Sequence, residues 1–277
     1  MSAISDNLIH FLARSEKDNP ARQFDVFTSI IETGLRTAST QIKFGGGGSV
    51  FNEIVCFTDI PLRECHDHAA IYGRFGIGFK KSYVKRVGGN PARYFVDYLP
   101  GQIPGKAPGE VMQECRGNLY ATLSVHQQFL VLLANLLQKH GKSLTLRDPE
   151  GQVVLGHGEV EGLYSTLLLN YSFDKEMGDL GPARDETEHI DVFYKEREWR
   201  VVPSRLTIES KSAVESGGHY YYGFSRADVN MVVVPSDEIR MQVLDYFHKL
   251  RRSKTPRLRE FGQNTLPIVI YDDLQRW

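Results

Sequence analysis

Two glutamates, Glu196 and Glu198, lie two residues apart in the charged segment 191–203. Residues i and i+2 of a β-strand point to the same face, so a strand here places both carboxylates side by side. Neighbouring carboxylates repel each other, and the pKa of one of them then rises. Such pairs occur where an enzyme handles a hydroxyl group or a developing cation, and also on ordinary charged edge strands. The pair is a candidate catalytic centre, with Arg197 and Arg200 expected on the other face of the strand.

The stretch 65–68, Cys-His-Asp-His, packs three potential metal ligands into four residues. Structural zinc sites usually draw on two such groups, and the sequence has no second cluster with metal-ligand spacing. We therefore interpret this stretch as a solvated helix face and expect no metal. Cys56 lies within an apolar stretch, which favours a buried small hydrophobe over a nucleophile.

Glycine-rich and basic segments offer further candidates for phosphate contact. The run Gly73–Gly78 lacks the strand–loop–helix order of a dinucleotide fingerprint, and Gly45–Gly48 lacks the Lys-Ser/Thr pair of a P-loop. Basic residues gather at 80–86 and 249–259. Each basic run is either a phosphate-contacting face or a solvated helix end.

The composition is that of an ordinary globular protein. The chain has 277 residues, of which 41% are hydrophobic and 24% charged, with a net charge of −1. This length and charge predict a single domain over 1–277 and no general attraction to nucleic acid or membranes. The sequence contains no apolar run long enough to span a membrane and no signal peptide, so we expect a cytoplasmic protein.

Hydrophobic periodicity predicts the elements that must position the candidate residues. Strands are expected at 8–14, 54–58, 75–79, 92–97, 193–202, 219–224, 230–234 and 266–271, and helices at 21–33, 62–72, 110–140, 161–171 and 236–250. Residues 37–49 are expected to form a mobile loop, and 206–214 to pair with the glutamate strand. Because strands cluster at both ends with helices between, we predict an α+β fold.

The order of several short segments resembles the AbiGi family of abortive-infection proteins from bacterial phage-defence loci. The matching segments are Leu8-Ile-His-Phe, Val55-Cys-Phe-Thr-Asp-Ile-Pro-Leu62, Tyr72 to Lys81, Gly89-Asn-Pro91, Glu196-Arg-Glu-Trp-Arg200 and Val232-Val-Val-Pro-Ser236. They extend over most of the chain and cover the central helical region least. The resemblance implies a role in phage defence, and the family's antitoxin label implies a toxin partner.

A more distant similarity connects the chain to DarT-type ADP-ribosyltransferases, which act on DNA. Both open with a strand carrying a histidine and continue with a helix that ends in Gly-Leu, here Gly34-Leu35. This similarity implies a mixed, mainly antiparallel split sheet of the ADP-ribosyltransferase type. The mainly helical segment 108–172 would then be an insertion in it.

The same similarity implies a reaction that uses NAD as a substrate. Glu198 would stabilise the oxocarbenium character that develops when the bond from ribose to nicotinamide breaks, and Glu196 would orient or deprotonate the acceptor. His10 would hydrogen-bond the other ribose. An aromatic residue would stack on the nicotinamide ring, and the candidates are Tyr72, Phe75, Phe79 and Tyr83. The acceptor would be a nucleic acid or a protein.

Two other functions remain open. The chain could be a non-catalytic antitoxin or regulator that binds a partner protein or nucleic acid, although it has no helix-turn-helix signature for operator binding. It could also be an interaction domain built on a decayed transferase scaffold. The apolar central helices would support a homodimer in any of these cases.

Overall fold

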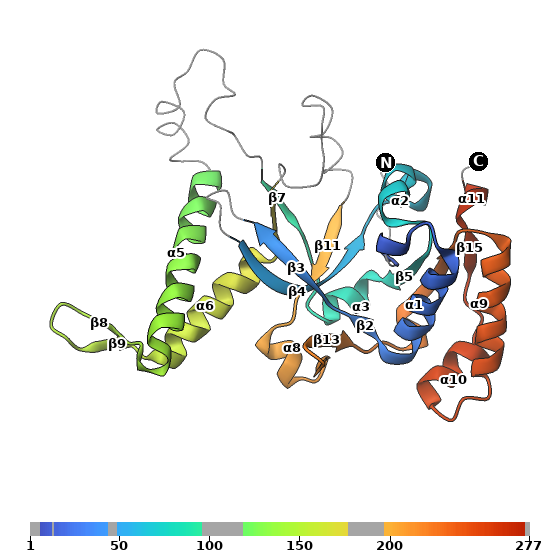
Figure 1. The fold of residues 1–277 in the computed structure, drawn as a ribbon. Helices are drawn as coiled ribbons and strands as arrows, with labels where there is room; N and C mark the ends of the chain where they lie inside the picture. Colours follow the sequence, from blue (N-terminus) through green and yellow to red (C-terminus); the bar gives the residue numbers. More distant parts are fainter. Residues whose placement is uncertain (1–5, 13, 44–48, 96–118, 177–196, 275–277) are drawn as a thin grey trace, which may run out of the picture. The chain divides into compact units, whose positions relative to one another are not determined.

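The computed structural model describes residues 6–12, 14–43, 49–95, 119–176 and 197–274 (Figure 1). The chain forms two compact units. Unit 1 consists of residues 1–39, 53–91 and 191–277, and unit 2 of residues 40–52 and 92–190. The single domain with an insertion at 108–172 stays a prediction. Within the described residues, no helix is both long and apolar enough to cross a membrane.

The main sheet has a mostly antiparallel arrangement. Its strands follow the order β15 (Ile268–Ile270), β14 (Val229–Val234), β5 (Gly76–Lys80), β1 (Asn7–Phe11), β4 (Ser49–Thr58), β11 (Glu198–Val201) and β6 (Asn90–Pro91), and β3 (Ala38–Lys43) also pairs with β4. β14 and β15 are parallel, whereas β1, β5, β11 and their neighbours pair antiparallel. The predicted α+β class and mainly antiparallel sheet are confirmed.

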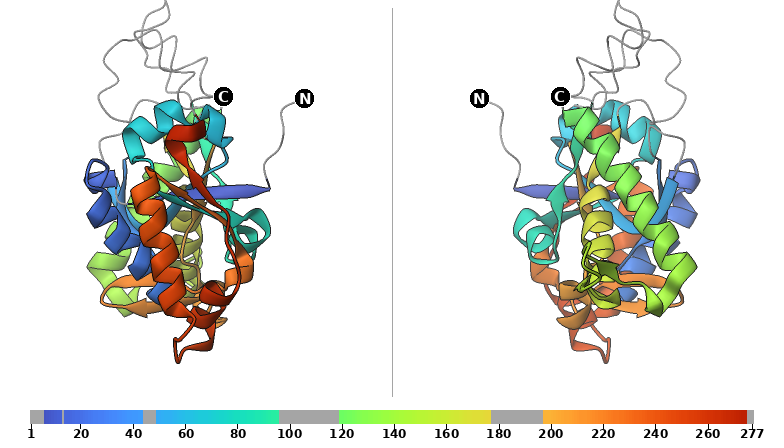
Figure 2. Two further views of the ribbon diagram at one scale, coloured as in Figure 1. Left: turned by 90° about the vertical axis from the view of Figure 1, so that its right-hand side faces the viewer. Right: turned by 90° about the vertical axis from the view of Figure 1, so that its left-hand side faces the viewer.

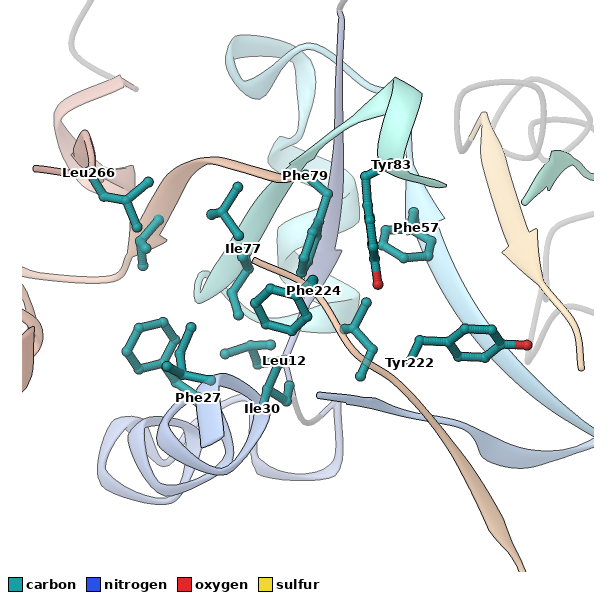
Figure 3. Packing of buried hydrophobic residues seen from close by; sticks show 14 of the residues in the cluster. Leu12, Phe27, Ile30, Phe57, Ile77, Phe79, Tyr83, Tyr222, Phe224 and Leu266 are labelled. Atoms are coloured by element: carbon teal, nitrogen blue, oxygen red, sulfur yellow. The ribbon is translucent and has the colours of Figure 1, made fainter. Parts of the chain in front are cut away.

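Helices α1 (Pro20–Thr33) and α9 (Asp237–Leu250) cover one face of this sheet. Both begin at side-chain caps: Asn19 accepts a hydrogen bond from the Arg22 amide, and Ser236 accepts one from the Ile239 amide. Their apolar faces join the strands in one core, which contains Val243. Figure 3 shows three other members of this core, Phe27, Ile77 and Phe79. The predicted helices 21–33 and 236–250 are therefore confirmed, including the serine cap.

The other face of the sheet carries a smaller cluster. Helices α2 (His66–Tyr72) and α11 (Tyr271–Leu274) supply Ala69 and Tyr271, which pack with Ile60, Cys65 and Val233. α9 lies beside β15 and α10 (Pro256–Gln263) and is in the foreground of the left view of Figure 2. The short helices η2 (Leu62–Glu64), α3 (Lys81–Arg86) and η5 (Arg226–Asp228) complete the connections.

A second sheet in unit 1 corrects the prediction for residues 206–214. Its strands are β12 (Ala213–Ser216), β13 (His219–Tyr222) and β2 (Leu35–Arg36). Residues Arg205–Glu209 form helix α8, because Ser204 and Thr207 cap its first turn reciprocally. The following strand β12 pairs with β13 and not with the glutamate strand.

The expected loop at 37–49 is also corrected, because residues 38–43 form β3. Thr40 and Ile42 favour a strand, and this local preference outweighs the glycines that follow. Residues 44–48 lie outside the described residues.

Unit 2 contains the two long helices predicted for the centre of the chain. α5 (Leu119–His140) and α6 (His157–Tyr171) pack through Leu133, Val160 and the neighbouring Leu144. β8 (Leu146–Arg147) and β9 (Val153–Leu155) pair antiparallel between the helices, and β7 (Arg93–Phe95) pairs in parallel with β10 (Asp174–Glu176). The last turn of α5 runs into a short 3-10 helix, η4 (Gly141–Ser143).

Candidate functional site: a groove beside strand β1

A groove of about 730 Å³ opens in unit 1 beside the end of β1. Its walls are formed by His10 and Phe11 of β1, by the short helix η1 (Arg14–Glu16), by α1 and by β2. The lining includes polar and charged side chains from all three of the last-named elements, among them Arg14, Arg22, Ser29 and Arg36. A space of this size, with several convergent polar groups, is large enough for a nucleotide-sized ligand.

His10 lies where strands β1 and β4 pair through Ile9 and Thr58. Its Nδ1 is 2.8 Å from the carbonyl oxygen of Cys56. A carbonyl oxygen can only accept, so Nδ1 carries the proton and donates it. Burial lowers the pKa of His10, and the hydrogen bond to Cys56 offsets this in part. The ring is therefore neutral at neutral pH, and its Nε2 is left as a hydrogen-bond acceptor.

Two arginines supply positive charge to the groove. The Arg14 guanidinium lies over the ring of Tyr72, 5.1 Å from its centroid, and Tyr72 in turn stacks on His68. Arg36 is exposed on β2, directly opposite Tyr221 of β13, which also lines the groove. The ion pairs between described residues include neither arginine. Both are suited to bind an anionic group such as a phosphate.

Carboxylates also line the groove, so its character is mixed and not purely cationic. Glu16 and Asp25 are both lining residues. Asp25 forms an exposed ion pair of 3.7 Å with Arg22, one turn along α1. With Arg22 paired to Asp25, the other charged lining residues are Arg14, Arg36 and Glu16, so the charged side chains of the lining carry a net charge of +1.

The aromatic candidates differ in position. Phe79 and Tyr83 are buried in the core, where Phe79 contacts Phe57 and Phe224 edge to face (Figure 3). Phe75, another candidate for stacking on the nicotinamide ring, is buried and stacks on Phe27. These three rings have no face toward the groove in this structure.

Tyr72 is not a lining residue, but its ring contacts one, the Arg14 guanidinium. The structure thus brings together His10, Arg14 and Tyr72, and it separates Phe79 and Tyr83 from them.

Glu198 lies at the start of β11, directly opposite Thr58 of β4. Directly opposed residues of neighbouring strands share a face, so Glu198 shares the face of Thr58 and Ile9. His10 is the next residue along β1 and therefore faces the other side of the sheet. The structure does not bring the imidazole and this carboxylate together. Glu196, the second glutamate of the pair, lies outside the described residues.

The carboxylate of Glu198 is engaged by Arg200. Arg200 Nε donates to Glu198 Oε1 at 2.9 Å, and the two side chains are only 9% and 11% exposed. Arg200 therefore shares the face of Glu198, contrary to the expectation that it would lie on the other face. The reason is the same i, i+2 alternation that relates the two glutamates. Arg197 precedes the strand with a φ of 42°.

Glu53 is a polar residue of unit 1 that no sequence motif identified. Its Oε2 accepts a hydrogen bond of 2.5 Å from Thr37 Oγ1 and lies 2.9 Å from His219 Nδ1. Burial raises the pKa of Glu53, but the hydrogen bonds from Thr37, His219 and Ser39 together outweigh it and lower the pKa below its usual value. The sequence offers one indication of where Glu53 lies. In a strand over 53–57, residues i and i+2 share a face, which places Glu53 on the face of Phe57.

Two predictions for cysteines are wrong: Cys56, expected to be a buried small hydrophobe, is exposed, and Cys65, expected on a solvated helix face, is buried. Cys65 is buried, and burial raises the pKa of its thiol to about 12, so it is not a reactive thiolate. In the basic run 249–259, Arg251 and Arg257 donate to backbone carbonyls of Gly262 and Phe224. Among the described residues, no group of three or more histidine, cysteine and acidic side chains could hold a metal ion.

Comparison with known proteins identifies a family. A family model described as "Putative abortive phage resistance protein AbiGi, antitoxin" matches residues 50–234. No curated protein and no solved structure matches the chain. The matched region contains Glu53 and Glu198, whereas His10, Arg14 and Arg36 of the groove precede it.

Proposed function

The chain belongs to the AbiGi family of abortive phage resistance proteins, and from this premise we propose that it binds NAD in the groove beside β1 and transfers ADP-ribose from it. The observation that carries the proposal is the fixed, neutral imidazole of His10 at the groove wall. With Nδ1 committed to the Cys56 carbonyl, Nε2 is available to accept a hydrogen bond from a ribose hydroxyl.

The charge of the groove supports a dinucleotide over an uncharged ligand. A diphosphate presents several anionic oxygens, and the planar guanidinium of arginine matches such groups with two parallel hydrogen bonds. Arg14 and Arg36 lie in the walls of the same groove as His10. We expect the diphosphate to bind these two arginines while His10 accepts from a ribose.

The transfer step requires a carboxylate near the reacting ribose, because the breaking C–N bond leaves positive charge on the sugar. Glu198 stays our candidate for this role, with Glu196 as the group that orients the acceptor. Since Glu198 is bound by Arg200 on the face away from His10, the transfer step requires both that this ion pair opens and that the backbone at the start of β11 turns the carboxylate toward the groove. Binding of NAD has no such requirement.

A titration calorimetry experiment tests the binding step. We expect wild-type protein to bind NAD and ADP-ribose, and Arg36→Ala to weaken both by roughly tenfold to a hundredfold, the value of one charge-assisted hydrogen bond. His10→Ala should weaken both as well. Arg205→Ala is a matched control, because Arg205 is an exposed arginine paired with Glu209 on α8. Absence of NAD binding by the wild type would refute the proposal.

A second assay tests the transfer. Protein is incubated with labelled NAD and cell extract, with and without DNA. Label on a macromolecule that disappears in Glu198→Gln supports the transferase. NAD binding without any turnover would instead favour a non-catalytic antitoxin that binds a toxin, which the family description and the position of Glu198 also fit.

A further inference from the structure

We infer that Glu53 is a positioning residue that fixes the groove wall carrying Arg36, and thereby sets the site for the diphosphate of the ligand. The inference rests on the proposed function for the identity of the ligand. Glu53 itself is not a lining residue of the groove. It acts through Thr37, the buried residue between Arg36 and Ala38.

The first step is the contact between Glu53 and the β2–β3 segment. Thr37 is fully buried, and its hydroxyl donates to Glu53 Oε2 at 2.5 Å while accepting from the Tyr220 amide at 3.0 Å. The Thr37 amide in turn donates to the Tyr220 carbonyl at 2.8 Å. Thr37 is thus fixed by hydrogen bonds to the Glu53 carboxylate and to Tyr220 of β13.

The second step is the alternation of side chains along this segment. Arg36 and Ala38 are exposed and line the groove, whereas Thr37 between them is buried. Successive residues of an extended chain point to opposite faces. Fixing Thr37 toward Glu53 therefore fixes Arg36 toward the groove.

The third step is the neighbouring strand. His219 Nδ1 lies 2.9 Å from the same Glu53 oxygen, and two residues later Tyr221 pairs with Arg36. Since an ionised carboxylate only accepts, both Thr37 and His219 must donate to it. Glu53 therefore joins both strands of the wall that presents Arg36 and Tyr221.

The test measures the binding of inorganic pyrophosphate to the full-length protein by chemical-shift titration. We expect Glu53→Gln to weaken pyrophosphate binding about fivefold, because a neutral amide oxygen accepts the hydrogen bonds of Thr37 and His219 more weakly than a carboxylate oxygen does. Glu215→Gln on the adjoining strand β12 is the control and should leave the affinity unchanged, since Glu215 is exposed. Thr37→Val should reproduce the loss, and Thr37→Ser, which keeps the hydroxyl, should restore most of it.

A double-mutant cycle separates positioning from a general loss of stability. If Glu53 acts through Arg36, then Glu53→Gln causes no further loss in an Arg36→Gln background. Equal losses in both backgrounds would overturn the inference, as would an unchanged affinity in Glu53→Gln. Should Glu53→Gln fail to fold, the Thr37→Val and Thr37→Ser pair gives the same decision.

The outcome is distinguishable from that of the proposed function. Coupled pyrophosphate binding without any NAD binding would overturn the NAD proposal and leave the role of Glu53 intact. If the protein binds NAD but the losses in pyrophosphate affinity caused by Glu53→Gln and Arg36→Gln are additive, the inference about Glu53 is overturned and the NAD proposal stands. If the wild-type protein binds neither NAD nor pyrophosphate, both proposals are refuted.

Discussion

A hydrogen bond to a backbone carbonyl determines the tautomer of the His10 imidazole. The bond from Nδ1 to the Cys56 oxygen selects one tautomer, and burial keeps that tautomer neutral. Protonation would convert Nε2 from an acceptor to a donor and reverse the hydrogen bond that a ribose hydroxyl could make. The same event would place a charge in a half-buried position beside the ring of Phe57.

These properties predict a pH dependence. The pKa of His10 is lowered in the folded protein, so the unfolded chain takes up its proton first as the pH falls below about 6.5. Unfolding then binds protons, and the free energy of unfolding decreases as the pH falls through this window. We expect NAD affinity to fall at a lower pH than stability does, because binding depends on the protonation of His10 in the folded protein, and denaturation and calorimetry over one pH series measure the two. His10→Gln should remove this part of the pH dependence, and His66→Gln, an exposed control, should keep it.

Glu198 and Arg200 lead to a prediction about stability. Breaking a poorly exposed ion pair costs more than breaking an exposed one, so we expect Glu198→Gln, which removes the negative charge beside Arg200, to lower the free energy of unfolding by about 2 kcal/mol. Glu209→Gln, which breaks the exposed pair with Arg205, should have no measurable effect in the same urea denaturation. Equal effects of the two variants would contradict the burial of the Glu198 pair.

Among the elements, the junction between α1 and β2 shapes the groove most directly. Gly34 ends α1 with a φ of 103°, and a Cβ atom there would lie 2.7 Å from the carbonyl oxygen of Tyr222. The residue is therefore restricted to glycine by both its backbone conformation and the approach of β13. The next two residues, Leu35 and Arg36, form β2 and carry the groove wall.

The same junction gives a prediction at this scale. Gly34→Ala should lower the free energy of unfolding by roughly 2 kcal/mol or more, because strain and a backbone contact combine. Gly162→Ala in α6 should raise it by about 0.5–1 kcal/mol, since a Cβ there meets no atom within 4 Å and alanine favours the helix. Urea denaturation monitored by circular dichroism compares the two. A stabilising Gly34→Ala would show that the junction is not constrained.

Elements with strong local signals could be predicted from the sequence, and those set by distant partners could not. β1, α1 and α9 were predicted because hydrophobic spacing and caps are local. Helix α8 was mistaken for a strand because its reciprocal Ser204–Thr207 cap uses a threonine where a glutamate or glutamine is usual. β12 could not be assigned to β13 from spacing alone, because the sequence does not encode which strand is the neighbour.

The candidate site shows the same division. His10 was identified by its resemblance to a histidine-bearing first strand, and the structure places it in the groove. Glu53 and Arg36 are 17 residues apart and join through Thr37 only once β2 and β4 are placed, so no motif marks them. Phe79 was a candidate for stacking on the nicotinamide ring because it is an aromatic residue in a predicted strand. The structure buries it in the core, and the sequence does not show which faces of the sheet the helices cover.

At the scale of the whole molecule, each of the two units has a hydrophobic core of its own. The core of unit 1 joins the sheet with α1 and α9, whereas that of unit 2 joins α5 with α6 through Leu133, Leu144 and Val160. Unit 2 is formed by two segments, 40–52 and 92–190, that interrupt unit 1 twice along the chain. The groove is formed entirely by residues of unit 1.

This division predicts that a cavity in one core affects the local stability of that unit. Leu133→Ala and Leu266→Ala remove the same atoms from well-buried positions in unit 2 and unit 1, and each should cost about 2–5 kcal/mol locally. Peptide-resolved hydrogen exchange measures this directly. We expect Leu133→Ala to accelerate exchange in α5 and α6 while α1 and α9 keep their wild-type rates, and Leu266→Ala to do the reverse. NAD affinity should fall in Leu266→Ala and stay unchanged in Leu133→Ala, because the groove belongs to unit 1. Acceleration of both units by either variant would mean that the two cores open together.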